Sequence, residues 1–189
     1  MKHLVLSLSI MLCFALTGCS TGPSAMIFSP QKVVSITNIY QGQAYKVHVS
    51  DNRSEKYLLK VIDSEGNKSR HPSANAVERK LLENLSSGFS VQGLTINPHA
   101  GATINLSIMQ METVVAQASF KYEAALSVEF KVTITRGSKT FYKTFTGHTS
   151  REGILKFDIA RLEQDLNQLV KTVMGDIFND DYIRQSIQA

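Results

Sequence analysis

The strongest constraint on the fold is a long alternation of apolar and polar residues from Ala118 to Ile134. Successive side chains of a β-strand point to opposite faces, so this run predicts one strand with a dry face and a wet face. Residues 136–139 read as a hairpin turn, and residues 140–149 as a returning antiparallel strand. The dry face must be covered by other elements. Its apolar and aromatic positions are Phe120, Tyr122, Ala124, Leu126, Val128, Phe130, Val132 and Ile134.

Shorter strands are predicted upstream of this hairpin. Alternation at residues 45–49 and an apolar run at residues 57–62 indicate two strands separated by turn residues. Residues 104–108 alternate as well, and the phase changes near Met109, which predicts a β-bulge or bend. Residues 33–36 are expected to form a first short strand.

Two apolar stripes at helical spacing predict two long helices. The first helix is expected at residues 73–87, with Ser73 or Asn75 as its N-cap and with Gly88 as its stop signal. The second begins near Asp158, and a short third helix follows residues 179–181. The stripe of the second helix consists of Ile159, Leu162, Leu166, Leu169, Val170, Val173 and Ile177.

These elements favour an α+β fold. We expect a mostly antiparallel sheet with two long helices packed on one face, because two striped helices match one dry sheet face in number and length. The chain is long enough for one domain with a substantial core. The net charge of +4 comes from scattered basic residues, so nucleic acid is not an expected partner.

The first 19 residues resemble a processing signal rather than part of the fold. A short basic start precedes an apolar run from Leu4 to Leu16, which is shorter than the ~20 residues that span a bilayer. Leu16, Thr17, Gly18 and Cys19 then form a lipobox. This order predicts cleavage before Cys19 and attachment of acyl chains such as palmitate to Cys19. The alternative is an ordinary secreted protein that is cut nearby, with Cys19 an incidental thiol.

The expected organisation has three parts. Residues 1–18 are a cleaved lipoprotein signal peptide, residues 19–32 a lipidated N-terminus with a short flexible linker, and residues 33–189 a single periplasmic domain. Ser20 follows the lipidated position, where aspartate would be the usual inner-membrane retention signal of bacterial lipoproteins. We therefore expect the protein on the outer membrane, anchored through its acyl chains and facing the periplasm.

No motif for catalysis or cofactor binding stands out. The mature chain keeps four histidines at wide spacing and has no Gly-x-Ser-x-Gly nucleophile motif, glycine-rich phosphate loop or free thiol. We expect no catalytic residues, no metal and no cofactor. Solvent-facing strand positions explain His48 and His148, and cross-strand ion pairing with Lys121 and Lys131 explains Glu123 and Glu129, better than a site does. The candidates considered are His48, His71, His99, His148, Glu112, Glu123, Glu129 and Asp158.

The layout resembles the YajG family of bacterial outer-membrane lipoproteins. The similar features are the lipobox, the segment Val47-His48-Val49-Ser50-Asp51-Asn52-Arg53, Leu81-Leu82-Glu83 with Gly88-Phe89, and the long alternating strand from Tyr122 to Thr135. The resemblance implies a lipoprotein of undefined molecular role without a catalytic set. It also implies that Asp51 and Arg53 form a structural pair in a turn.

The functional expectation is a non-enzymatic interaction module that binds a protein partner in the envelope. An exposed sheet edge is one surface on which such a partner binds. The alternative is an accessory carrier for lipid or glycan fragments, which requires an apolar cavity between sheet and helices. A cell-wall hydrolase is the least supported reading.

Overall fold

The computed structural model describes residues 25–33, 39–40 and 42–189. The expected strand at residues 33–36 lies almost wholly outside these residues. No helix of the described part is long and apolar enough to cross a membrane. The elements are β1 (Ala44–Asp51), β2 (Tyr57–Ile62), β3 (Lys68–Pro72), α2 (Val77–Val91), β4 (Thr95–Ile96), β5 (Ala102–Gln117), β6 (Lys121–Arg136), β7 (Lys139–Ile154), α3 (Ile159–Asn179) and α4 (Asp181–Gln188).

The predicted hairpin and bulge are confirmed, and so is the alternation from Tyr122 to Ile134. The expected place of Phe120 on the dry face is wrong, because this residue lies in the connection between β5 and β6 and is 77% exposed. β6 buries its even-numbered residues from Tyr122 to Ile134, and it pairs with β7 through the turn at Gly137. The register of β5 against β6 shifts between Ile108 and Gln110, at the place where the apolar phase changes. Because the bulge inserts one residue, the apolar residues on both sides of it keep facing the core.

The sheet is mixed, so the expected mostly antiparallel sheet is wrong. One edge of β5 pairs antiparallel with β6. The other edge of β5 pairs in parallel with two strands, first with β1 and farther along with β2. β4 is also parallel to β1. Parallel partners are joined by crossovers rather than by tight turns, so the local turn signals in the sequence do not reveal them.

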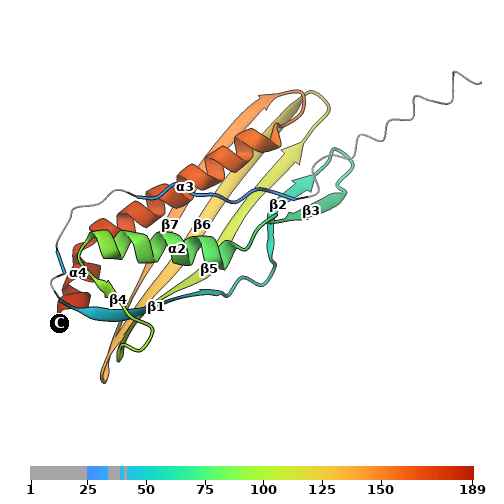
Figure 1. Cartoon of the computed structure of the whole chain (residues 1–189). Helices are drawn as coiled ribbons and strands as arrows, with labels where there is room; N and C mark the ends of the chain where they lie inside the picture. The colour runs from blue at the N-terminus through green and yellow to red at the C-terminus, as the bar shows by residue number, and fades with distance from the viewer. Residues whose placement is uncertain (1–24, 34–38, 41) are drawn as a thin grey trace, which may run out of the picture.

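The expected pair of long helices lying together on the sheet is also wrong. Among the helices of the described residues, α3 is the one that runs along the long strands, where it contacts β5, β6 and β7 (Figure 1). α2 lies over β1 and β4 and touches α3. The predicted cap of α3 is confirmed, because the Asp158 carboxylate accepts a hydrogen bond from the Ala160 N–H at 2.9 Å. Asp180 caps α4 in the same way.

The predicted helix stop at Gly88 is wrong. α2 continues through Gly88 to Val91, and the glycine instead makes room for α3. A Cβ atom placed on Gly88 would lie 2.1 Å from Cζ of Phe178. The Phe178 ring packs edge-on against Phe89, with ring centroids 5.1 Å apart. The absence of a side chain at Gly88 therefore serves helix contact and not helix ending.

Residues 25–33 lie along α2 and α3, and we call this segment the strap (Figure 1). Met26 and Phe28 are fully buried in it, although both fall in the expected linker. Polar side chains of the helices hold its backbone: Asn167 accepts from the Ser29 N–H, and the Asn84 amide donates to the Gln31 carbonyl. The part of the chain that leads to the predicted anchor is thus packed on the domain from residue 25 onward.

Candidate functional site

The predicted lipidation site lies outside the described residues. Leu16, Thr17, Gly18 and Cys19 precede residue 25, the first that the structure describes. Lipidation of Cys19 and recognition of the three residues before it stay predictions.

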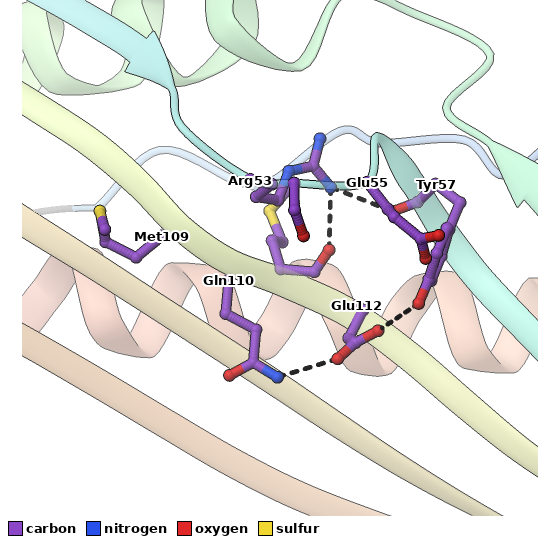
Figure 2. Close-up of a pocket in the computed structure, with 8 residues that line it drawn as sticks. Arg53, Glu55, Tyr57, Met109, Gln110 and Glu112 are labelled. Carbon is purple, nitrogen blue, oxygen red and sulfur yellow. Dashed lines mark hydrogen bonds between the residues drawn. The ribbon is translucent and has the colours of Figure 1, made fainter.

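A small recess beside the β5 bulge is lined by polar side chains from separate parts of the chain (Figure 2). It has a volume of about 120 Å³ and lies between the loop after β1, the start of β2 and the middle of β5. Its lining residues are Arg53, Ser54, Glu55, Tyr57, Met109, Gln110, Met111 and Glu112.

Arg53 is the buried centre of this recess. Its guanidinium binds both carboxylate oxygens of Asp51, with Nε–Oδ1 at 2.9 Å and Nη2–Oδ2 at 2.8 Å. Its Nη1 donates to the backbone carbonyls of Tyr57 and Met111. The pairing of Asp51 with Arg53, which the family resemblance implied, is confirmed. The pair ties the end of β1 to β2 and β5.

The pKa of Asp51 reflects this pairing. Burial by itself raises the pKa of Asp51, but the hydrogen bonds and the charge of Arg53 outweigh burial and hold it below its ordinary value. The carboxylate is therefore charged at neutral pH, and its role is structural rather than that of a proton carrier.

Tyr57 and Glu112 form the second polar contact of the recess (Figure 2). The Tyr57 hydroxyl donates to Glu112 at 2.9 Å, and the Gln110 amide donates to the other oxygen of the same carboxylate, also at 2.9 Å. Burial and the hydrogen bond to Glu112 raise the pKa of Tyr57 to about 12. A phenol with this pKa stays protonated at neutral pH and serves as a hydrogen-bond donor.

The chemistry that this recess offers is limited. Its charged groups hold one another, and its volume is well below the ~300–1,000 Å³ of typical ligand pockets. A wider recess of about 530 Å³ lies on the open sheet surface beside Val114, Ala125 and Ser150. Neither of these two recesses is a cavity between the sheet and the helices.

The structure does not bring the candidate histidines together. His48 on β1 lies in one row with Asn105, Thr133 and Tyr142, and His148 is six residues farther along β7 than Tyr142. Residues 25–33, 39–40 and 42–189 contain no cluster of three or more His, Cys, Asp or Glu side chains that could hold a metal ion.

The candidate acids are also dispersed. Glu123 pairs with Lys121 at 2.7 Å on its own strand, and Asp158 caps α3. Glu112 belongs to the recess described above, and Glu129 lies on β6 opposite Gln110. Ion pairing thus accounts for Glu123, although its partner is on the same strand and not across the ladder as we expected.

The wet face of the sheet presents a broad polar surface that sequence reasoning did not single out as a site. Tyr142 is 65% exposed there, and the Lys131 ammonium lies 4.8 Å from its ring centroid. Ser50, Asn105 and Ser107 form a hydrogen-bonded cluster on the same face. The alternation of the strands predicted a polar face, but only the parallel pairing of β1 with β5 brings Ser50 beside Ser107.

β7 is a long edge of this surface. Within the described residues it pairs with β6 alone, along its full length from Lys139 to Ile154. An edge strand carries backbone N–H and C=O groups that another extended segment can use.

Comparisons with known proteins support the expectation of a lipoprotein family, but not the YajG type. The model of a family described as "Uncharacterized lipoprotein" matches residues 30–188. No curated protein is significantly similar to this chain. In fold, the chain is similar to protein XCC0632 from Xanthomonas campestris, which belongs to the DUF330 family, with a TM-score of 0.60, 16% identity, and coverage of 87% of this chain and 100% of that one.

A more distant likeness is to a neuraminyllactose-binding hemagglutinin homolog from Helicobacter pylori. Its TM-score is 0.48 at 10% identity, with coverage of 84% of this chain and 94% of that one. These likenesses in structure concern the fold alone, because both identities are low.

Proposed function

This chain belongs to the Lipoprotein_16 family of uncharacterized lipoproteins. On that premise, we propose that it is anchored by lipid in the outer membrane and faces the periplasm. There it binds an envelope partner without catalysing a reaction. The observation that carries the proposal is the lipobox ending at Cys19, directly before a folded domain. The narrower assignment to the YajG type is part of the same proposal.

The structure supports an interaction role over a catalytic one. The buried charges of the recess hold backbone segments together, as Arg53 does with the carbonyls of Tyr57 and Met111. The exposed surface, by contrast, offers a long sheet edge at β7 and a polar face with an exposed tyrosine. Surfaces of this kind bind extended segments of partner proteins by adding a strand.

The anchor is tested by Cys19→Ala. We expect this variant to lose fatty-acid labelling and to keep its signal peptide, because acylation of the thiol precedes cleavage. Metabolic labelling with a palmitate analogue and intact mass measurement detect both changes. Cys13→Ala is the matched control, since residue 13 lies within the expected signal peptide. Label that persists in Cys19→Ala would refute the anchor.

The partner surface is tested by photo-crosslinking in intact cells. A photoreactive amino acid in place of Thr146, an exposed residue on β7, is expected to give a discrete adduct with an envelope protein. The same amino acid in place of Arg79, exposed on α2 and away from the edge, serves as control. Equal adducts at both positions, or none at either, would contradict a partner site at β7.

The alternative, a carrier for lipid or glycan fragments, finds less support. The recess of about 530 Å³ is open on the surface of the sheet rather than enclosed between the sheet and the helices. Native mass spectrometry of the purified protein would favour a carrier if a lipid or glycan fragment copurified in stoichiometric amount.

A further inference from the structure

The segment where β5 turns into β6 and the segment where β7 leads into α3 lie at one end of the molecule (Figure 1). These two segments carry three large exposed apolar side chains. Phe120 is 77% exposed, Ile154 83% and Leu155 62%. We call these three residues the apolar tip. The Leu155 N–H donates to the Phe120 carbonyl at 2.8 Å, and Lys121 pairs with Ile154, so the two segments lie side by side. A cluster of exposed apolar residues marks a contact surface more often than a single one does.

The apolar tip is held in place rather than left loose. The Gln117 side-chain amide donates to the Leu155 carbonyl at 2.8 Å and to the Ala118 carbonyl at 2.6 Å. Its oxygen accepts from the Phe157 N–H at 3.4 Å. One side chain thus joins the β5–β6 turn to the segment after β7, and the apolar side chains are presented from a fixed backbone.

Folding does not explain the leucine at position 155. Its φ is +67°, and it is the one residue other than glycine with positive φ in the described part of the chain. This conformation is strained for a bulky residue and suits glycine or asparagine. Since Leu155 is also mostly exposed, it gains little packing in return. An apolar side chain kept there points to a contact outside the domain.

The strap begins on the side of the molecule that faces the apolar tip. Met26 bridges Ser73 in parallel, directly after β3, and β3 runs away from the tip because it is antiparallel to β2. β2 is parallel to β5, which ends at the tip. The strap therefore runs away from the apolar tip, and its first residues are at the end nearer the tip (Figure 1).

The reach of the chain before the strap is short. Cys19 lies six positions before Ala25, and six residue steps span at most about 20 Å. Pro72 pairs with Tyr57 on β2, and β2 pairs with β5. At the usual rise per residue, the distance along the strands from this pair to the β5–β6 turn is roughly 20 Å. An acylated Cys19 thus keeps the bilayer surface within about 20 Å of Ala25, and this reach extends to the level of the apolar tip.

We propose that the apolar tip inserts into the interface of the bilayer that holds the lipid anchor. This inference rests on the proposed anchoring at Cys19. The domain then stands on the membrane on two contacts, acyl chains and tip, with the β7 edge and the wet face directed sideways. Lys121 and Lys156 flank the tip, but Asp63 and Glu65 in the β2–β3 turn lie at the same end. Since these charges offset one another, the contact is apolar and does not need anionic lipid.

Depth-dependent quenching tests this proposal. The mature acylated chain has no other free thiol, so Ser119→Cys accepts a single environment-sensitive fluorophore in the β5–β6 turn. Ser138→Cys, in the β6–β7 turn at the opposite end, is the matched control. Both acylated proteins are reconstituted into phosphatidylcholine vesicles that contain lipids with a quencher at the acyl chain. We expect the probe at 119 to lose most of its fluorescence and the probe at 138 to keep it.

A variant within the tip separates insertion from mere proximity. Phe120→Ser combined with Leu155→Asn removes two apolar side chains, and asparagine tolerates the positive φ, so the melting temperature should not fall. We expect quenching at 119 to be lost in this background. Quenching that persists there, or that requires anionic lipid, would overturn the proposal.

Flotation of the acylated protein with the vesicles distinguishes failure of the anchor from failure of tip insertion. If the acylated chain does not float with the vesicles, the anchor itself is wrong and the tip falls with it. If it floats while the probe at 119 is as bright as the probe at 138, the anchor stands and insertion of the tip is wrong.

Discussion

Arg53→Ala is expected to lower the free energy of unfolding by about 3–5 kcal/mol, the usual cost of removing one partner of a buried ion pair. The Arg53 side chain is 6% exposed and that of Asp51 10%. Without the guanidinium, Asp51 keeps only Lys56 as a charged partner, and the carbonyls of Tyr57 and Met111 each lose a donor. Equilibrium unfolding in urea measures the change.

A surface pair provides the control. Lys121→Ala removes one partner of the Lys121–Glu123 pair, whose side chains are 69% and 60% exposed. Exposed pairs contribute little because water and salt screen them, so we expect a urea midpoint close to that of the unmodified protein. Equal effects of Arg53→Ala and Lys121→Ala would show that Arg53 is not the buried link that the geometry indicates.

The pH dependence of stability follows from the pKa of Asp51. Because this pKa is lower in the folded chain than in the unfolded chain, the pair stabilises the fold at neutral pH, and the stabilisation is lost as pH falls through the folded pKa. The difference in unfolding free energy between the unmodified protein and Arg53→Ala should therefore be smaller at about pH 3 than at pH 7. A difference that stays constant between these conditions would contradict the assignment.

Local patterns predicted the local structure of this chain well. The alternation of β6, the phase change at Met109 and the cap at Asp158 each depend on residues close in sequence, and each is confirmed. Gly88 shows the limit of such reasoning. A glycine near the end of an apolar stripe resembles a helix stop, but its role depends on Phe178, which lies 90 residues away.

The non-local features could not be read from one sequence. β3 is almost entirely polar and exposed, so no apolar pattern marks it as a strand. The parallel pairing of β1 and β2 with β5 follows from the crossover path, and the buried recess around Arg53 forms only through that pairing. The Asp51–Arg53 contact was expected from the family resemblance, whereas no pattern pointed to the contact between Tyr57 and Glu112, which are 55 residues apart.

The strap was missed for a different reason. Serine, proline and glycine between residues 20 and 30 resemble a flexible linker, and they outweigh the three large apolar side chains among them, Met26, Ile27 and Phe28. Asn75, expected as a helix cap, instead exchanges hydrogen bonds with the backbone of Phe28 at 3.2 Å and 2.7 Å. Its side chain thus serves the strap, and α2 begins after Ala76 without a side-chain cap.

Phe28→Ala is expected to cost about 3–5 kcal/mol of stability, as for other fully buried phenylalanines. Phe28 is completely buried, whereas its neighbour Ile27 is 55% exposed. Ile27→Ala is therefore the matched control, because it shortens an adjacent side chain and keeps the backbone hydrogen bonds of the strap. We expect its urea midpoint to stay close to that of the unmodified protein. Similar midpoints for the two variants would mean that the strap does not pack on the domain in solution.

The same pair of variants connects stability to membrane geometry. If Phe28 holds the strap, its loss lengthens the free tether between Cys19 and the domain, because the strap N–H groups that donate to Asn75, Glu163 and Asn167 are no longer held in place. In acylated protein with a probe at position 119, Phe28→Ala should then weaken quenching by the bilayer under conditions where the domain is still folded, while Ile27→Ala should leave it unchanged. Stability lost without any change in quenching would show that the tip contacts the membrane independently of the strap.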